Sequence, residues 1–213
     1  MTQMTLLFDL DGTLVDSLQD LTNAVNHARK HFSLEPISTA QTKSYIGDGQ
    51  VNLVKRAFFD ADEGLDIQQP LKILQTYYQE HLLDCTTLFP GVKETLQQLA
   101  ANCKLGVVTN KPQAAAERIC QGLNIAEFLC CIIGGGRTVN LKPHPEPLLL
   151  ALELCDGRPE NAWMIGDHYT DLAVAAAAGC KSCFCEFGYG QTRQEKPDCR
   201  IQQFADLPKI LWT

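Results

Sequence analysis

The hydrophobic residues of the chain follow one pattern before about residue 88 and another after it. Residues 5–10 form a short, continuously apolar run, which is typical of a strand buried on both faces. Apolar residues then recur at every third or fourth position, which predicts helices over 17–31, 39–46, 50–59 and 70–83. Ser17 is the expected N-cap of the first helix. No strand is predicted between about 15 and 87.

After residue 88, strand-like and helix-like segments alternate. Strands are expected over 104–109, 128–133, 162–165 and 182–187, and helices over 92–101, 113–121, 146–155 and 171–178. Such alternation predicts a parallel sheet covered by helices, an α/β core of the three-layer, Rossmann-like kind. The helices before residue 88 then form an inserted, all-helical cap domain. We expect the core to comprise 1–14 and 88–213 and the cap 15–87, with hinges near 15–17 and 88–91.

Composition narrows the class of protein. An apolar content of 45% in 213 residues is ordinary for a globular protein, and the net charge of −7 argues against nucleic-acid or anionic-membrane partners. The N-terminal apolar run has no basic residues before it and stops at Asp9, unlike a signal peptide. No stretch approaches the roughly 20 apolar residues that span a bilayer. We therefore expect a cytoplasmic protein, a monomer or a homodimer.

Ten cysteines are present, and three of them cluster in CKSCFC at 180–185. Without a secretory signal, free thiols are expected rather than a disulfide framework. The C-x-x-C of this cluster has no second ligand pair at zinc-finger spacing and lies in a strand-like run. Cysteines that fill the core are therefore favoured over a zinc site.

Polar side chains follow several of the predicted strands, at the sheet edge where ligands of parallel sheets bind. They are Asp9 and Asp11 after the first strand, Thr109 and Asn110 after the second, Lys142 in the loop after the third, and Asp167 and Asp171 after the fourth. Carboxylates that converge in this way repel one another unless a cation lies among them. The pattern therefore predicts a metal that prefers oxygen ligands.

Four segments resemble, in order, the four motifs of the haloacid-dehalogenase superfamily, and specifically its phosphatases with a helical cap. They are FDLDGTLVDS at 8–17, VVTN at 107–110, LKPHPEP at 141–147 and IGDHYTD at 165–171. The resemblance covers nearly the whole chain. A lone DxD is a weak signal, whereas DxDGT after an apolar strand, followed by three further motifs, is a strong one.

The resemblance implies a role for each strand-end residue. Asp9 is expected to attack phosphorus and form an aspartyl-phosphate, with Asp11 as the acid and base. Thr109 and the Asn110 amide are expected to bind the phosphoryl group, whose charge Lys142 neutralises. Mg²⁺ is the expected cofactor, bound by the Asp9 side chain, the Asp11 carbonyl, Asp167 and, directly or through water, Asp171. The alternative for Asp171 is the N-cap of the following helix.

The residue at position 11 also separates related reactions. The dehalogenases carry a different residue there and the phosphonate hydrolases a small one, whereas the carboxyl group of Asp11 suits an alkoxide leaving group that needs a proton. Related phosphomutases carry a histidine about a dozen residues after the nucleophile, where this chain has Leu21. Hydrolysis of a phosphomonoester is therefore expected.

Within the capped group, the chain is most similar to phosphoglycolate phosphatases, through YIGDG at 45–49, KPHPEPLLLAL at 142–152, and AAGC at 177–180 followed by FGYG. The amides of Gly47 and Gly49, before a helix, are expected to receive a substrate anion, unless this segment is a plain turn. His168 stands where serine or threonine is common in the fourth motif. It is expected to bind phosphate or leaving group, unless it points to water.

A small phosphorylated metabolite, with 2-phosphoglycolate first, is thus the expected partner. One alternative is a broad-specificity hydrolase of sugar phosphates, nucleotides or pyrophosphate. The other is an inactive protein that binds a phosphorylated ligand, against which the complete set of motif residues argues.

Overall fold

A six-stranded, wholly parallel sheet forms the centre of the computed structural model, which describes residues 3–212. Its strands, in spatial order, are β5 (Cys131–Gly135), β4 (Cys103–Pro112), β1 (Met4–Phe8), β6 (Ala162–Gly166), β7 (Lys181–Cys185) and β8 (Cys199–Ile201). Strand β1 is central: Leu7 pairs with Gly106 of β4 on one side and with Met164 of β6 on the other. The predicted three-layer α/β fold is confirmed.

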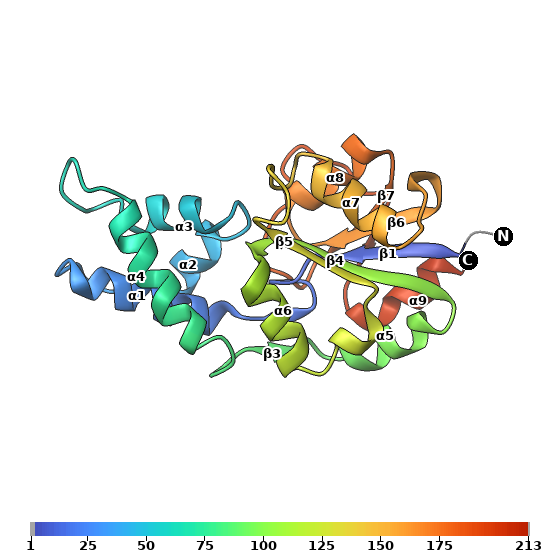
Figure 1. The fold of residues 1–213 in the computed structure, drawn as a ribbon, viewed down its shortest axis with the longest axis horizontal. Helices are drawn as coiled ribbons and strands as arrows, with labels where there is room; N and C mark the ends of the chain where they lie inside the picture. The colour runs from blue at the N-terminus through green and yellow to red at the C-terminus, as the bar shows by residue number, and fades with distance from the viewer. Residues whose placement is uncertain (1–2, 213) are drawn as a thin grey trace.

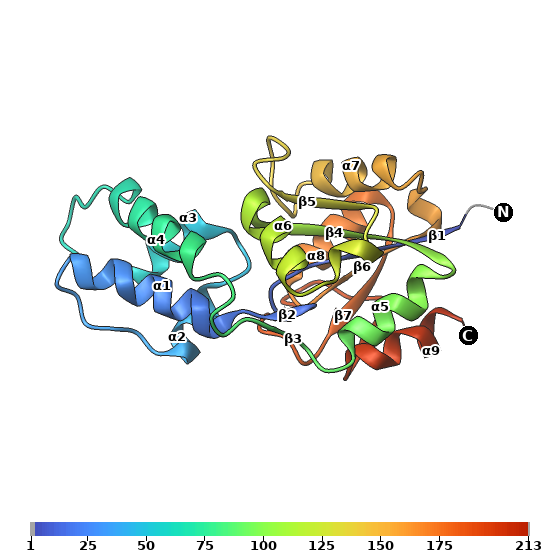
Figure 2. The same ribbon diagram turned by 60° about the horizontal axis from the view of Figure 1, so that its bottom comes forward.

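Helices cover both faces of this sheet (Figures 1 and 2). Helices α5 (Val92–Ala100), α6 (Gln113–Gly122) and α9 (Leu207–Leu211) lie on one face, and α7 (Glu146–Leu154) and α8 (Tyr169–Ala178) on the other. Successive side chains of β1 point to opposite faces of the sheet. Leu6 and Phe8 pack in the apolar cluster with α5, α6 and α9, and Leu7 packs in the cluster with α7 and α8. Burying one such side chain contributes about 1.5–3 kcal/mol to folding. The continuous apolar run of β1 follows from this double burial.

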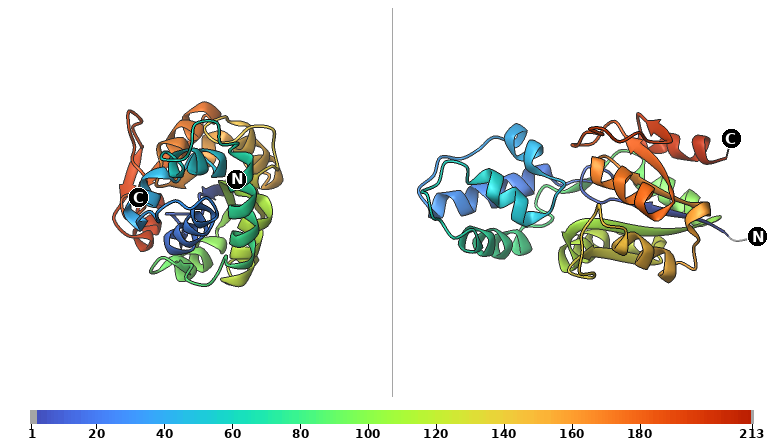
Figure 3. Two further views of the ribbon diagram at one scale, coloured as in Figure 1. Left: turned by 90° about the vertical axis from the view of Figure 1, so that its left-hand side faces the viewer. Right: turned by 90° about the horizontal axis from the view of Figure 1, so that it is seen from above.

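Four helices form a separate group beyond the carboxyl ends of the strands (Figures 1 and 3). They are α1 (Leu18–His31), α2 (Thr39–Tyr45), α3 (Gln50–Ala57) and α4 (Gln68–Glu80), called the helical group below. The buried guanidinium of Arg29 ties the end of α1 to the chain after α3. It donates to both carboxylate oxygens of Asp60, at 2.7 and 2.8 Å, and to the Glu35 carbonyl at 2.6 Å. The domain boundaries at 14/15 and 87/88 stay a prediction.

The two chain segments that join the helical group to the sheet pair with each other. Strands β2 (Val15–Asp16) and β3 (Thr87–Leu88) are antiparallel, with Val15 opposite Leu88. The expectation of no strand near 15 and 87 was wrong at these ends, because two residues are too few to show a pattern. Ser17 does occupy the N-cap of α1, but its hydroxyl makes no capping bond and donates to Asp11 instead.

Several boundaries differ from the predicted ones. Strand β5 begins at Cys131, because residues Ala126–Phe128 form a 3₁₀ turn (η1), and it continues into Gly135. The 3₁₀ turns η2 (Pro159–Asn161) and η3 (Phe204–Asp206) and the elements β8 and α9 were not predicted.

The cysteines are all free, and those of β7 are buried in the core. Within residues 3–212, no cysteine belongs to a group of side chains with metal-binding geometry. No helix in the same range has the length and apolar character that a membrane span requires.

Candidate active site

Three aspartates meet at the carboxyl edge of the sheet. Asp9 follows β1, Asp167 follows β6, and Asp171 lies in the first turn of α8. One carboxylate oxygen of each lies within 4.8 Å of one oxygen of the other two. Because β1 and β6 are neighbours and parallel, their carboxyl ends deliver these side chains to one place. All three residues are buried.

The electrostatics of this group favour a bound cation. Burial, with the charges of Asp9 and Asp171, raises the pKa of Asp167 to about 7. Burial also raises the pKa of Asp9 to about 6, although the Lys142 ammonium opposes the shift. The Thr13 hydroxyl donates to Asp167 at 2.9 Å. A hard divalent cation fits this buried set of oxygen ligands and would relieve their mutual repulsion.

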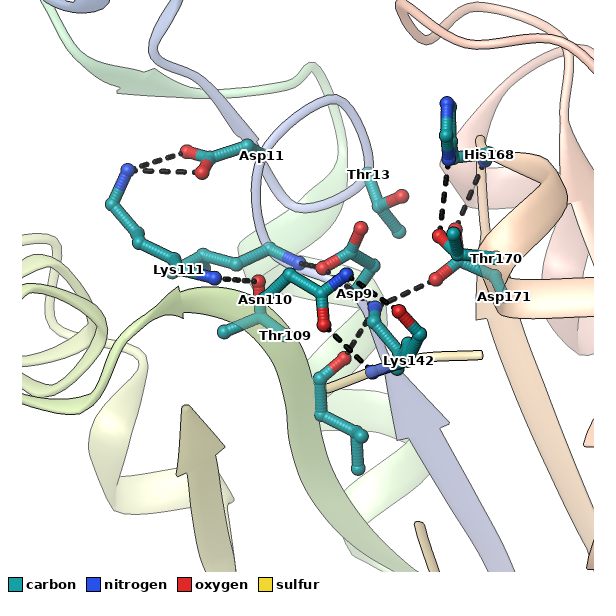
Figure 4. A network of polar contacts seen from close by, with 12 residues as sticks. Asp9, Asp11, Thr13, Thr109, Asn110, Lys111, Lys142, His168, Thr170 and Asp171 are labelled. Carbon is teal, nitrogen blue, oxygen red and sulfur yellow. Dashed lines mark hydrogen bonds and ion pairs between the residues drawn. The ribbon is translucent and has the colours of Figure 1, made fainter. Parts of the chain in front are cut away.

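Lys142 places one positive charge inside the group (Figure 4). Its ammonium lies 3.1 Å from Oδ1 of Asp9 and donates to Oδ1 of Asp171 at 2.6 Å and to the Val108 carbonyl at 2.7 Å. Burial lowers the pKa of Lys142, but the charges of Asp171 and Asp9 outweigh burial, so the net shift is upward. Lys142 is therefore charged at neutral pH.

Asn110 fixes the backbone that carries Lys142. Its side chain accepts from the Lys142 N–H at 2.9 Å and donates to the Lys142 carbonyl at 3.0 Å. It also donates to the Gly47 carbonyl of the helical group at 3.1 Å. The predicted contact with phosphate involves the backbone amide of Asn110, whereas these hydrogen bonds involve its side chain. Asn110 can therefore hold Lys142 and bind phosphate at the same time. Thr109, one residue earlier, hydrogen-bonds Asp9, a contact that favours the ionised carboxylate.

Asp11 does not join the other carboxylates (Figure 4). Its side chain turns toward Lys111, whose ammonium lies 2.8 and 2.9 Å from the two carboxylate oxygens, and accepts from Ser17 at 2.5 Å. Lys111 in turn donates to the Tyr78 hydroxyl of α4 at 2.6 Å. Lys111 was not predicted as a site residue, although it directly follows VVTN at the same strand end.

A pocket opens beside Asp9, between the sheet edge and the helical group. Its lining combines motif residues with residues of the helical group: Asp9, Asp11, Leu21, Ile46, Gly47, Gly49, Gln50, Leu53, Thr109, Asn110, Lys111 and Pro112. Gly47 and Gly49 thus line the pocket, and the contact of their amides with a substrate anion stays a prediction. Both have positive φ, +115° and +87°, which glycine adopts without strain.

His168 is absent from the residues found to line this pocket. Its ring packs against Gly47, where an added Cβ would lie 2.6 Å from the imidazole, and its Nδ1 lies 3.0 Å from the Thr170 hydroxyl. Burial lowers the pKa of His168 to about 4, so the ring is neutral at pH 7. The contact between His168 and a substrate stays a prediction, while the structure gives the ring a packing role beneath the helical group.

Asp171 contributes to the helix start as well as to the acidic group. Its Oδ2 accepts from the His168 N–H at 2.9 Å, and His168 occupies the N-cap, so Asp171 lies at the third helical position. The alternative interpretation of Asp171 as the N-cap was therefore wrong, because the N-cap is His168, three residues earlier. The other oxygen of Asp171 remains bound to Lys142.

The chain is similar to known proteins along nearly its whole length. The sequence model of haloacid dehalogenase-like hydrolases matches residues 6–185. A phosphoglycolate phosphatase from Chromobacterium violaceum is 36% identical, over 96% of this chain and 94% of the relative. One from Yersinia pseudotuberculosis is 38% identical, over 94% and 89%.

Among solved structures, a predicted phosphoglycolate phosphatase from Haemophilus somnus 129PT superposes with a TM-score of 0.92 at 34% identity, covering 99% of each chain. The family match extends from β1 to the end of β7, and so includes every strand end that carries an acidic or phosphate-binding candidate. The chain belongs to the haloacid dehalogenase-like hydrolase family.

Proposed function

We propose that this phosphatase is a Mg²⁺-dependent phosphoglycolate phosphatase, which hydrolyses 2-phosphoglycolate through a phosphoryl group carried on Asp9. The observation that supports this most is the position of Asp9. Its carboxylate lies at the floor of a pocket, against Lys142 and two further aspartates. The curated relatives described above carry the same activity in their names.

Asp9 begins the proposed reaction. Its Oδ1 accepts from the Leu10 N–H at 2.7 Å and faces Lys142, which together fix the orientation of the carboxylate. A carboxylate oxygen forms a bond to phosphorus while the ester P–O bond breaks, and the leaving oxygen takes a proton from Asp11. Water then attacks phosphorus with Asp11 as the base, the bond to Asp9 breaks, and inorganic phosphate leaves.

The phosphoryl oxygens would be held by the Thr109 hydroxyl, the Asn110 amide and Lys142. Mg²⁺, held by Asp9, Asp167, the Asp11 carbonyl and, directly or through water, Asp171, supplies positive charge at these oxygens when bound. Asp167 and Asp171 are not among the described residues found to line the pocket, whereas residues of the helical group are, so the leaving group would extend toward the helical group.

The helical group would act as a cap that closes over the substrate. Its loop at 46–49 supplies part of the pocket wall. Two hydrogen bonds join this loop to the sheet domain, from Asn110 to the Gly47 carbonyl and from the Tyr169 hydroxyl to Asp48 at 2.9 Å. The amides of Gly47 and Gly49 are candidates for contact with the substrate's carboxylate.

The test is a substrate panel with and without Mg²⁺. We expect kcat/KM for 2-phosphoglycolate to exceed that for sugar phosphates, nucleotides and pyrophosphate by more than about tenfold, roughly 1.4 kcal/mol of transition-state binding. A smaller preference would favour the broad-specificity alternative. Phosphate release from an aryl phosphate that persists without a divalent cation, or in Asp9→Asn, would contradict the proposed chemistry.

A further inference from the structure

A buried lysine, Lys111, lies in the pocket wall and has no part in the reaction described above. It comes from β4, two residues after Thr109, and only 6% of its surface is exposed. Its ammonium donates to both oxygens of Asp11 and to Tyr78, whose ring centre lies 4.7 Å away. A lysine buried at this depth needs a negatively charged partner, and in this structure the partner is Asp11.

The position of Asp11 conflicts with its proposed task. The acid that protonates the leaving oxygen has to approach the phosphoryl group on Asp9, but Asp11 points away from Asp9 and is bound by Lys111 and Ser17 (Figure 4). Turning Asp11 toward Asp9 would leave the Lys111 ammonium buried without a counter-ion. Asp11 can therefore act only if another anion takes its place beside Lys111.

The pocket offers a substrate anion no positively charged partner besides Lys111 among the described residues found to line it. Much of the remaining wall is apolar, with Leu21, Ile46 and Leu53 contributed by the helical group. In 2-phosphoglycolate a single methylene separates the ester oxygen from the carboxylate, so a carboxylate at Lys111 keeps the leaving oxygen close to Asp11.

We infer that the substrate's carboxylate replaces Asp11 as the partner of Lys111, and that this exchange releases Asp11 to turn toward the leaving oxygen. The inference rests on the proposed function and names the residue that selects its substrate. A phosphoester without a neighbouring anionic group leaves Asp11 bound to Lys111 and is hydrolysed slowly. Tyr78, which holds the ammonium from α4, is a positioning residue for this exchange.

The experiment compares 2-phosphoglycolate with ethyl phosphate, which carries a methyl group in place of the carboxylate. In Lys111→Met we expect kcat/KM for 2-phosphoglycolate to fall about a hundredfold, because the carboxylate loses its partner. For ethyl phosphate we expect it to stay within about threefold or to rise, because Lys111 no longer holds Asp11 away from the leaving oxygen. Lys55→Met, at an exposed lysine of α3, is the matched control and should leave both values unchanged.

Two further variants control for the possibility that Lys111→Met loses activity through a folding defect. Lys111→Gln keeps a polar group at the site and should lose the same preference, and Lys111→Arg, which keeps the charge, should retain it in large part. Circular dichroism and thermal melting verify the fold of each variant. Equal losses for 2-phosphoglycolate and ethyl phosphate in folded Lys111 variants would overturn the inference.

The outcomes also separate this inference from the proposed function. If the wild-type protein prefers 2-phosphoglycolate and Asp9→Asn is inactive, the proposed function holds whatever the Lys111 variants do. If the wild-type protein does not distinguish 2-phosphoglycolate from ethyl phosphate, the proposed substrate and the role of Lys111 are both wrong. An aryl phosphate, whose leaving group needs little protonation, should be hydrolysed by Lys111→Met at close to the wild-type rate.

Discussion

The ammonium of Lys142 lies between two buried carboxylates, 3.1 Å from Asp9 and 2.6 Å from Asp171. This places a fixed positive charge beside the proposed nucleophile. The backbone of Lys142 is held by Asn110, which also contacts Gly47. One network of ion pairs and hydrogen bonds therefore joins the acidic group to the loop that lines the pocket.

Replacing Lys142 by methionine should impair both chemistry and folding. The charge that neutralises the phosphoryl group is lost, and we expect kcat/KM for 2-phosphoglycolate to fall by about 10²–10³. Two carboxylates lose a buried partner, which should lower the free energy of unfolding by about 3–5 kcal/mol in the absence of metal. Steady-state kinetics and urea unfolding measure the two effects. Wild-type kinetics in this variant would remove Lys142 from the mechanism.

Gly47→Ala should disturb the pocket, whereas Gly64→Ala should not. Both glycines have positive φ, +115° and +100°, so alanine introduces backbone strain of about 1 kcal/mol or more at either position. Only at Gly47 would the new methyl group meet another side chain, the His168 ring, whereas Gly64 has nothing within 4 Å. We expect at least a tenfold loss of kcat/KM in Gly47→Ala and less than about twofold in Gly64→Ala. Equal effects on kcat/KM would show that the contact with His168 does not matter.

Mg²⁺ should stabilise the protein more at high pH than at low pH. In the metal-free folded protein the pKa values of Asp9 and Asp167 are about 6 and about 7, above the ordinary value of 3.8. Protonation of these two carboxyl groups at low pH therefore stabilises the metal-free folded state. As pH rises from about 4 to about 7 this stabilisation is lost, while the ionised ligands that Mg²⁺ needs become available.

Thermal melting checks this dependence. The increase in Tm on adding Mg²⁺ should be larger at about pH 8 than at about pH 5. Asp167→Asn, which removes one candidate ligand, should abolish most of the increase. A shift of equal size at both pH values would contradict the involvement of these carboxylates in metal binding.

Much of the fold could be predicted because its signals are local and repeated. The run 5–10 before Asp9 and the alternation after residue 88 both follow from burial of the sheet on two faces. Strand β8 escaped prediction because it is a three-residue edge strand whose central residue, Arg200, is exposed. The strand predicted over 128–133 stops short of Gly134 and Gly135, which extend β5 at the edge of the sheet.

The site was predictable only as far as strand order determines it. Asp9 and Asp167 lie together because β1 and β6 are adjacent. The alternation of strands and helices predicts a parallel sheet with all carboxyl ends at one edge, whereas the order of the strands required the structure. The orientation of Asp11 depends on Lys111 and on Tyr78, which is separated from both in sequence. No periodicity distinguishes Tyr78 from the other apolar residues of α4, so the contact required the structure.

The most direct test of the central claim is to trap the phosphoryl group on the enzyme. The wild-type protein is mixed with 2-phosphoglycolate and Mg²⁺, quenched rapidly in acid during turnover, digested and analysed by mass spectrometry. We predict one added phosphoryl group on the peptide that contains Asp9, and none in Asp9→Asn, which should also release no phosphate. A phosphoryl group on any other residue, or phosphate release by Asp9→Asn at the wild-type rate, would contradict the assignment of Asp9 as the nucleophile.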